Sequence, residues 1–165
     1  MSERVSALLI HDGSSAFAAL HRMLESRDLE VSTAHSCGDA LLRLWSESPP
    51  HLVFTEVQLL DGIWADVISM TRKSRLPVNV IVVSRLADVN LYVQVLERGG
   101  FDFVVPPFEV SELEHIILCA TDNILAQRSR QQAGLMAASE AVPLNSPPRE
   151  EESLIDDDLQ AAPML

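Results

Sequence analysis

The sequence contains little cysteine and no long hydrophobic run. Two cysteines, Cys37 and Cys119, occur in 165 residues. They are too few for a disulfide framework, and neither has a second cysteine nearby with which to form a metal-binding pair. The longest apolar runs have the length of strands, so we expect no membrane-spanning segment. The first residues, MSERVSALLIHDG, also lack the basic leader and apolar stretch of a signal peptide. These features predict a cytoplasmic protein with reduced thiols.

Basic residues are also scarce. The chain has 12 Lys and Arg against 24 Asp and Glu, which gives a formal net charge of −12. A field of that sign repels the phosphate backbone of nucleic acids and the headgroups of anionic lipids. We therefore expect neither a nucleic acid nor a membrane to be a direct partner.

The sequence alternates short apolar runs with segments whose apolar residues recur at helical spacing. Apolar residues make up 47% of the chain and charged residues 22%, as in ordinary globular proteins. Each predicted strand is followed by a segment with apolar residues at helical spacing. The predicted strands cover residues 5–10, 29–33, 52–55, 78–83 and 103–105.

Five β–α units in succession imply a parallel sheet, because parallel strands require crossover connections. The leading α/β topology is a doubly wound five-stranded parallel sheet. In such folds the functional site lies at the carboxyl ends of the strands. That edge is predicted to carry His11 with Asp12, Glu56, Ser84 with Arg85, and Pro106.

The domain is expected to cover residues 4–126. Residues 127–165 are predicted to form the extended end of the last helix and then a disordered, acidic, proline-containing tail. One island in that tail, Ser153–Leu159, combines Leu and Ile with three Asp residues. It is either a docking segment that orders on a partner or part of a solubilising tail, and the composition favours the second interpretation.

Four segments in this order resemble the response-regulator receiver domain of two-component signalling. The resemblance implies a flavodoxin-like (βα)5 fold with strand order 2-1-3-4-5. ALLIHDGSS resembles the first strand of that family and the acidic pair after it, and HLVFTEVQLLDG resembles the third strand with the phosphoacceptor position. VIVVSR resembles the fourth strand, with Ser84 where the family keeps Ser or Thr. GGFDFVVPPF resembles the fifth strand and the Lys-Pro junction that follows it. The resemblance covers residues 4–125.

The resemblance assigns a role to each residue at the strand ends, and three of them depart from the family pattern. His11 stands at the first acidic position, Glu56 at the phosphoacceptor position and Pro106 at the position of the lysine. Asp12 keeps the second acidic position. Three further residues keep family positions, namely Ser84 and Phe103 as switch residues and Pro107 as the candidate for a cis peptide bond.

The departures remove parts that phosphoryl transfer requires. A glutamate places its oxygens roughly 1.5 Å further out than an aspartate, and Pro106 supplies no cation to the transferred group. Glu56 is therefore either a built-in carboxylate that imitates the phosphorylated state and passes its charge to Ser84, or a polar residue tolerated at a formerly reactive position.

The two flanking residues also have two interpretations each. Asp12 and Glu56 could bind Mg²⁺ together, although the plainer role for Asp12 is a helix cap. No cofactor is predicted with certainty. Beside these carboxylates, the protonated form of His11 is expected to be stabilised, with simple charge relief as the plainer interpretation.

The resemblance also implies a partner surface, formed by the fourth helix, the fifth strand and the fifth helix. Its candidate residues are Leu91, Tyr92, Glu97, Arg98, Phe101 and Phe108. Of these, Tyr92 falls on the apolar stripe of its helix, which favours a place in the core.

The sequence thus predicts a non-enzymatic, stand-alone receiver module that acts by protein contact, with phosphorylation lost or weakened. Its partner would be a histidine kinase or a downstream effector, and a homodimer is another possibility. The alternative is a working phosphorelay regulator that accepts phosphate at a non-standard residue. A small metal-dependent α/β enzyme is the third hypothesis, and no nucleophile–base pair supports it.

Overall fold

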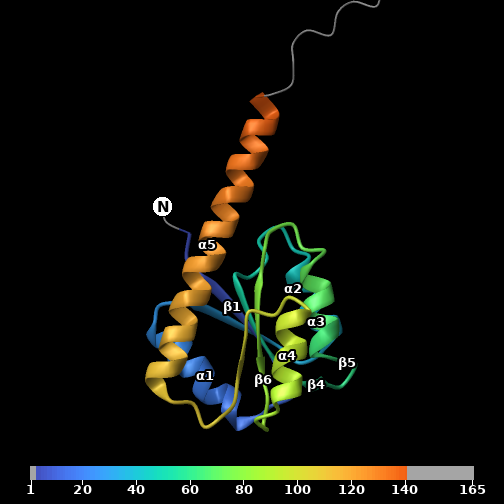
Figure 1. Ribbon diagram of the computed structural model, residues 1–165, viewed down its shortest axis with the longest axis vertical. Coiled ribbons are helices and arrows are strands. Elements are labelled where there is room, and N and C mark those ends of the chain that lie inside the picture. The colour runs from blue at the N-terminus through green and yellow to red at the C-terminus, as the bar shows by residue number, and fades with distance from the viewer. Residues whose placement is uncertain (1–2, 141–165) are drawn as a thin grey trace, which may run out of the picture.

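A computed structural model describes residues 3–140 and shows an α/β fold around one parallel sheet (Figure 1). The tail beyond residue 140, with the island Ser153–Leu159, lies outside the described residues. The elements are β1 (Ser6–Ile10), α1 (Ser15–Ser26), β2 (Glu30–Ala34), α2 (Cys37–Leu44), β3 (Leu52–Glu56), β4 (Gln58–Leu59), β5 (Gly62–Ile63), α3 (Trp64–Thr71), β6 (Asn79–Val83), α4 (Val89–Glu97), β7 (Asp102–Val104) and α5 (Val110–Glu140).

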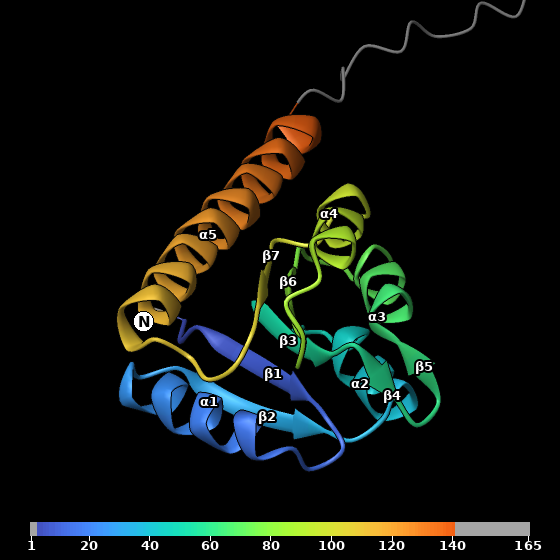
Figure 2. The same cartoon turned by 60° about the horizontal axis from the view of Figure 1, so that its bottom comes forward.

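The sheet has the order β2-β1-β3-β6-β7, and every neighbouring pair is parallel. This confirms the predicted fold class and strand order, since β6 and β7 are the fourth and fifth strands of the sheet. The alternation of side chains along a strand divides the core into two layers. In β1, Ala7 and Leu9 face α1 and α5, whereas Leu8 and Ile10 face α2, α3 and α4. Figure 2 shows these helices on opposite sides of the sheet.

The segment after β3 forms a short antiparallel hairpin of β4 and β5, which the predicted strands of the sequence do not include. Asp61 at its tip accepts hydrogen bonds from the backbone N–H groups of Cys37 (2.7 Å) and Gly38 (3.0 Å) at the start of α2. These bonds lower the pKa of the Asp61 carboxyl. A side chain at Gly62 would lie 2.7 Å from the Cys37 sulfur. The hairpin is therefore held by contacts distant in sequence, which a local pattern does not reveal.

Helix α5 packs on the sheet through an apolar stripe and extends well beyond it. The stripe residues Leu113, Ile116, Ile117, Ala120 and Ile124 are all buried. The helix then continues to Glu140 and projects from the domain (Figure 1). Among the described residues, no helix is both long enough and apolar enough to cross a bilayer. The domain limits of 4–126 stay a prediction.

A buried arginine fastens α5 to the amino end of the sheet. The guanidinium of Arg128 donates to the carbonyl oxygens of Pro77 (3.0 Å), Pro49 (3.1 Å) and Pro50 (2.7 Å). Burial lowers the pKa of Arg128. These bonds join the chain segments that precede β3 and β6 to one helix, so they hold the two central strands in place at their amino ends.

Replacing Arg128 by alanine should lower the free energy of unfolding by about 2 kcal/mol, because three carbonyl groups lose their donor in a buried setting. Urea denaturation of the wild type and the variant measures the difference. Arg130→Ala is the matched control, since this exposed arginine, within residues 3–140, bonds to one partner, the carbonyl of Ala126 in its own helix. Equal losses in the two variants would contradict a special role for Arg128.

Candidate functional site

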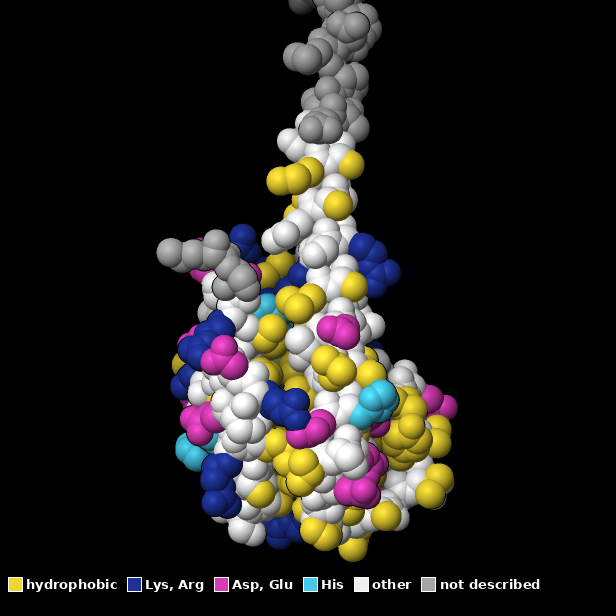
Figure 3. All heavy atoms as spheres, turned by 90° about the vertical axis from the view of Figure 1, so that its left-hand side faces the viewer, with side chains coloured by type: hydrophobic (Ala, Val, Ile, Leu, Met, Phe, Trp, Pro, Cys, Tyr) yellow, Lys and Arg dark blue, Asp and Glu magenta, His cyan; other side chains and the backbone are white. Residues whose placement is uncertain are grey.

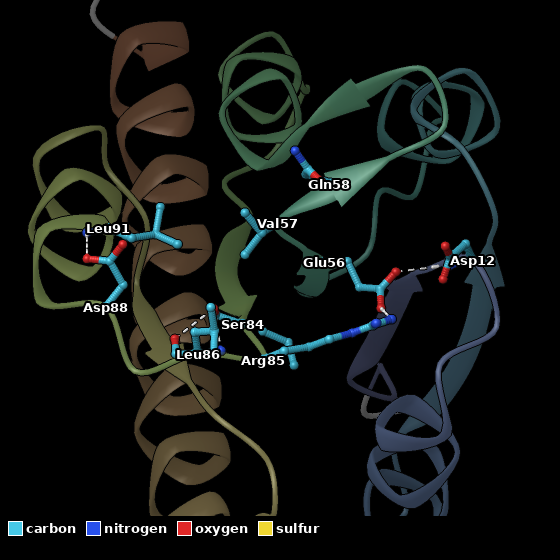
Figure 4. Close-up of a pocket in the computed structure, with 10 residues that line it drawn as sticks. Asp12, Glu56, Val57, Gln58, Ser84, Arg85, Leu86, Asp88 and Leu91 are labelled. Atoms are coloured by element: carbon cyan, nitrogen blue, oxygen red, sulfur yellow. Dashed lines mark hydrogen bonds and ion pairs between the residues drawn. The ribbon is translucent and has the colours of Figure 1, made fainter.

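The carboxyl ends of β1, β3 and β6 border one open pocket of about 410 Å³ (Figure 4). Asp12 follows β1, Glu56 ends β3, and Ser84 with Arg85 follows β6; all four line the pocket. The parallel register places these strand ends together, because Ile10 lies opposite Thr55, and Glu56 lies opposite Val83. The structure thus brings together the residues that the sequence places at this edge, except His11 and Pro106, which do not line the pocket.

Glu56 is the buried carboxylate of the pocket, with 8% of its surface exposed. Its Oε2 accepts a hydrogen bond from the backbone N–H of Asp12 at 3.2 Å, and its Oε1 lies 3.5 Å from Nη2 of Arg85. Burial raises the pKa of Glu56, and the charge of Asp12 raises it further. The hydrogen bond from the Asp12 N–H and the positive charge of Arg85 both lower the pKa of Glu56. Each oxygen of Glu56 therefore already faces a donor from this chain.

Sequence reasoning missed the role of Arg85. Its side chain, 75% exposed, extends from the end of β6 across the pocket to Glu56 (Figure 4). The guanidinium supplies to this carboxylate the positive charge that Pro106 lacks. The only cue in the sequence is a basic residue at the end of a predicted strand, and that cue does not reveal the direction in which a long side chain extends.

Ser84 is turned away from Glu56. Its buried hydroxyl donates to the carbonyl of Leu86 at 2.8 Å and accepts from the N–H of the same residue. The predicted transfer of charge from Glu56 to Ser84 is therefore not supported by a contact.

The other switch residue, Phe103, is half-buried and meets Tyr92 edge to face at 5.9 Å. The prediction that Tyr92 belongs to the core is wrong, because 39% of this residue is exposed on the outer side of α4. Its ring packs against the half-buried Phe103 ring, so the apolar stripe of α4 turns toward the surface there.

The His11 ring contacts Phe17 and the backbone of Gly13, and no ion pair joins it to Asp12 or Glu56 among the described residues. Its ring stacks on Phe17 at 4.5 Å, and Nδ1 accepts the N–H of Gly13 at 3.0 Å. Burial lowers the pKa of His11 and the neighbouring His35 lowers it further, while Asp12 raises it. The expected stabilisation of the protonated form is therefore wrong, since burial and a second histidine outweigh the one carboxylate that favours it.

Asp12 does not cap α1 as its plainer interpretation predicts. Ser14 occupies the N-cap position, and no side chain there accepts a hydrogen bond from the helix. The Asp12 carboxylate instead lies at the pocket opposite Glu56 (Figure 4).

Pro106 and Pro107 lie outside the Glu56 pocket. The peptide bond between them is cis, the isomer that the resemblance implies. Both residues line a second hollow of about 800 Å³ between α1 and the segment before α5, together with Met23 and Phe108. Arg85 borders both hollows. The position of the family lysine therefore contributes no charge to the pocket.

The pocket does not suit the Mg²⁺ ion that the resemblance implies. Asp12 and Glu56 are its carboxylates nearest to the strand ends, and magnesium prefers a nearly regular octahedron of oxygen ligands. The guanidinium of Arg85 beside Glu56 opposes a divalent cation at the same oxygens. Within residues 3–140, no three acidic, histidine or cysteine side chains are placed to hold a metal ion.

Comparison with known proteins agrees with this fold. The family model described as the response regulator receiver domain matches residues 7–118. The transcriptional regulatory protein PrrA of Mycobacterium leprae is 34% identical over 108 residues, which cover 64% of this chain and 45% of PrrA. The acid tolerance regulatory protein ActR of Rhizobium meliloti is 25% identical over 108 residues, or 66% of this chain and 55% of ActR. This chain spans about half the length of these curated relatives.

Solved structures show the same architecture. A CheY-like response regulator receiver domain protein from Methanospirillum hungatei superposes with a TM-score of 0.66 at 20% identity, covering 75% of this chain and 98% of that one. A response regulator receiver domain protein from Clostridium thermocellum gives a TM-score of 0.63 at 22% identity over 72% of this chain and 95% of that one. The match of the family model to most of the folded chain, together with this strand order, shows that the protein belongs to the response regulator receiver domain family of two-component systems.

Proposed function

We propose that this receiver domain signals through protein contacts and that phosphoryl transfer at its pocket is lost or greatly weakened. The observation that carries the proposal is the placement of Glu56 between the Asp12 N–H and the Arg85 guanidinium. Both carboxylate oxygens of the residue at the phosphoacceptor position are thus already engaged by donors of this chain.

The chemistry of the pocket supports this loss. Glu56 carries its oxygens roughly 1.5 Å further from the backbone than an aspartate, and a misplacement of about 1 Å can cost a hundredfold in rate. Phosphoryl transfer also needs a cation for the developing charge on the phosphoryl oxygens. Pro106 supplies none, and the charge of Arg85 is shared with Glu56.

The partner is a signalling protein, a histidine kinase or a downstream effector, that binds the face formed by α4, β7 and α5. Val89, Tyr92, Val93 and Leu96 repeat at helical spacing along α4, and all four are exposed. Such a stripe of apolar side chains supports a protein interface. A second copy of the chain is the competing occupant of this face.

The location that we propose is cytoplasmic. The small number of cysteines in the chain supports it.

The purified protein, incubated with Mg²⁺ and acetyl phosphate, should gain no phosphoryl group in intact mass spectrometry. Phosphorylation needs an in-line aspartate and a free cation, and this pocket has neither. The matched positive control is the triple variant H11D/E56D/P106K, which restores the family pattern at the three altered positions and should acquire one phosphoryl group. A stoichiometric adduct on Glu56 of the wild type would overturn the proposal.

Arg85→Ala should raise the pKa of the Glu56 carboxyl further, because the substitution removes the one cation that favours its charged form. A carbon-13 NMR titration of the carboxyl at low ionic strength measures the change, since salt screens so exposed a guanidinium. Arg22→Ala, an exposed arginine on α1, is the control and should leave the pKa of Glu56 unchanged. An unchanged pKa in Arg85→Ala would mean that the ion pair does not form in solution.

Glu56→Gln should change how stability depends on pH. The folded protein holds the Glu56 proton more tightly than the unfolded chain does. The stability from this group is therefore present below the unfolded pKa and is lost as pH rises through the folded pKa. Urea unfolding across this pH range should show wild-type stability falling relative to that of Glu56→Gln. A difference that does not vary with pH would contradict the raised pKa.

A further inference from the structure

Basic residues gather at the amino end of the sheet, away from the Glu56 pocket. Arg72, Lys73 and Arg75 follow α3 within four residues, and all three are exposed. Among the described residues, the carboxylate paired with this group is Glu47, which lies 3.7 Å from Arg75 and is itself 95% exposed. An ion pair so open to solvent neutralises little charge. This group is therefore a positive patch on a chain whose net charge is −12.

The patch borders a hollow of about 280 Å³ whose lining mixes polar and apolar side chains. Leu76, Pro77 and Val78 are half-buried and supply its apolar part, while Thr71 and Ser74 add polar groups. Gln131 of α5 closes one side, and its side-chain amide donates to the carbonyl of Arg75 at 3.1 Å. A ligand that fits this hollow combines a few aliphatic groups with negative charges around them.

We propose that the hollow binds this chain's own segment 150–158, Glu-Glu-Glu-Ser-Leu-Ile-Asp-Asp-Asp. Its six carboxylates flank Leu154 and Ile155, so the aliphatic pair meets the half-buried Leu76, Pro77 and Val78 while the acids meet the basic residues of the patch. No segment among residues 3–140 carries this pattern of acids around an aliphatic pair. The interaction is independent of phosphorylation and of the α4 face.

The chain is long enough to make this contact. Gln131 lines the hollow, and α5 rises past the loops at that end of the domain (Figure 1). The nine residues from Gln131 to Glu140 add about 14 Å of helix. The 14 residues from there to Leu154 reach up to about 46 Å. The segment can therefore return to the hollow with length to spare.

Segment 150–158 belongs to the same chain as the hollow, so even a weak contact between them is enough to keep the hollow occupied. A segment tethered through a short linker has an effective concentration of about a millimolar at its site. Residues 131–139 of α5 include no charged side chain. The face of this projecting segment seen in Figure 3 shows hydrophobic side chains. It therefore offers the acidic segment little competition for the basic patch. A partner that binds segment 150–158 must displace it from the hollow.

Paramagnetic relaxation in the full chain tests the proposal. A nitroxide is attached at Ser153→Cys in a Cys119→Ser background, where the remaining Cys37 is buried. The amide signals of Arg75, Leu76 and Val78 should broaden at low salt. The broadening should disappear in 0.5 M NaCl, because salt screens exposed charges. It should also be lost in Leu154→Ser/Ile155→Ser, a change that leaves the folded domain untouched.

The matched pair of variants is Lys73→Glu/Arg75→Glu against Arg22→Glu/Arg43→Glu, two reversals of exposed charge at different places on the domain. The first should abolish the broadening and the second should retain it. Broadening that is absent from the parent, or that survives Lys73→Glu/Arg75→Glu, would overturn the proposal. Broadening seen only between molecules, in a mixture of labelled and isotope-enriched chains, would assign the hollow to a second copy and would also overturn it.

Discussion

Parallel pairing of β1, β3 and β6 is the constraint on which the core and the pocket both depend. Parallel strands begin at one edge of a sheet and end at the other, so their carboxyl ends must meet. The same pairing exposes two faces that both need covering, and α1 with α5 and the three middle helices provide this cover. Glu56 ends β3, the central strand, with hydrogen-bonded neighbours on both sides. Its burial, and hence its raised pKa, is a consequence of that position.

The positive charge beside Glu56 comes from Arg85, at the end of β6. In the family pattern that this chain resembles, a lysine after the last strand faces the phosphoacceptor. Here that position is Pro106, in a different hollow, while Arg85 reaches Glu56 from the end of the neighbouring β6. A guanidinium is permanently charged and can bond a carboxylate through its planar edge. The pair therefore balances charge within the chain at the place where a receiver domain would take up a phosphoryl group.

The two ends of the sheet have different chemistry. At the carboxyl end, short-range pairing between Glu56, Asp12 and Arg85 leaves an open pocket with mixed charge. At the amino end, Arg128 is buried against three carbonyl groups, while the arginines and lysine after α3 remain in solvent. One set of cations thus stabilises the fold, and the other leaves positive charge at the surface of an acidic protein.

The amino-acid sequence alone determined the order of the elements, the parallel sheet and the edge that holds Asp12, Glu56 and Ser84. Hydrophobic period is a local property of a chain, and successive β–α units permit only crossover connections between parallel strands. It did not determine the stacking of His11 on Phe17, the exposure of Tyr92 or the reach of Arg85. Those depend on which side chains meet across elements far apart in sequence. A long side chain such as Arg85 has many rotamers, and only the packed neighbours select one of them.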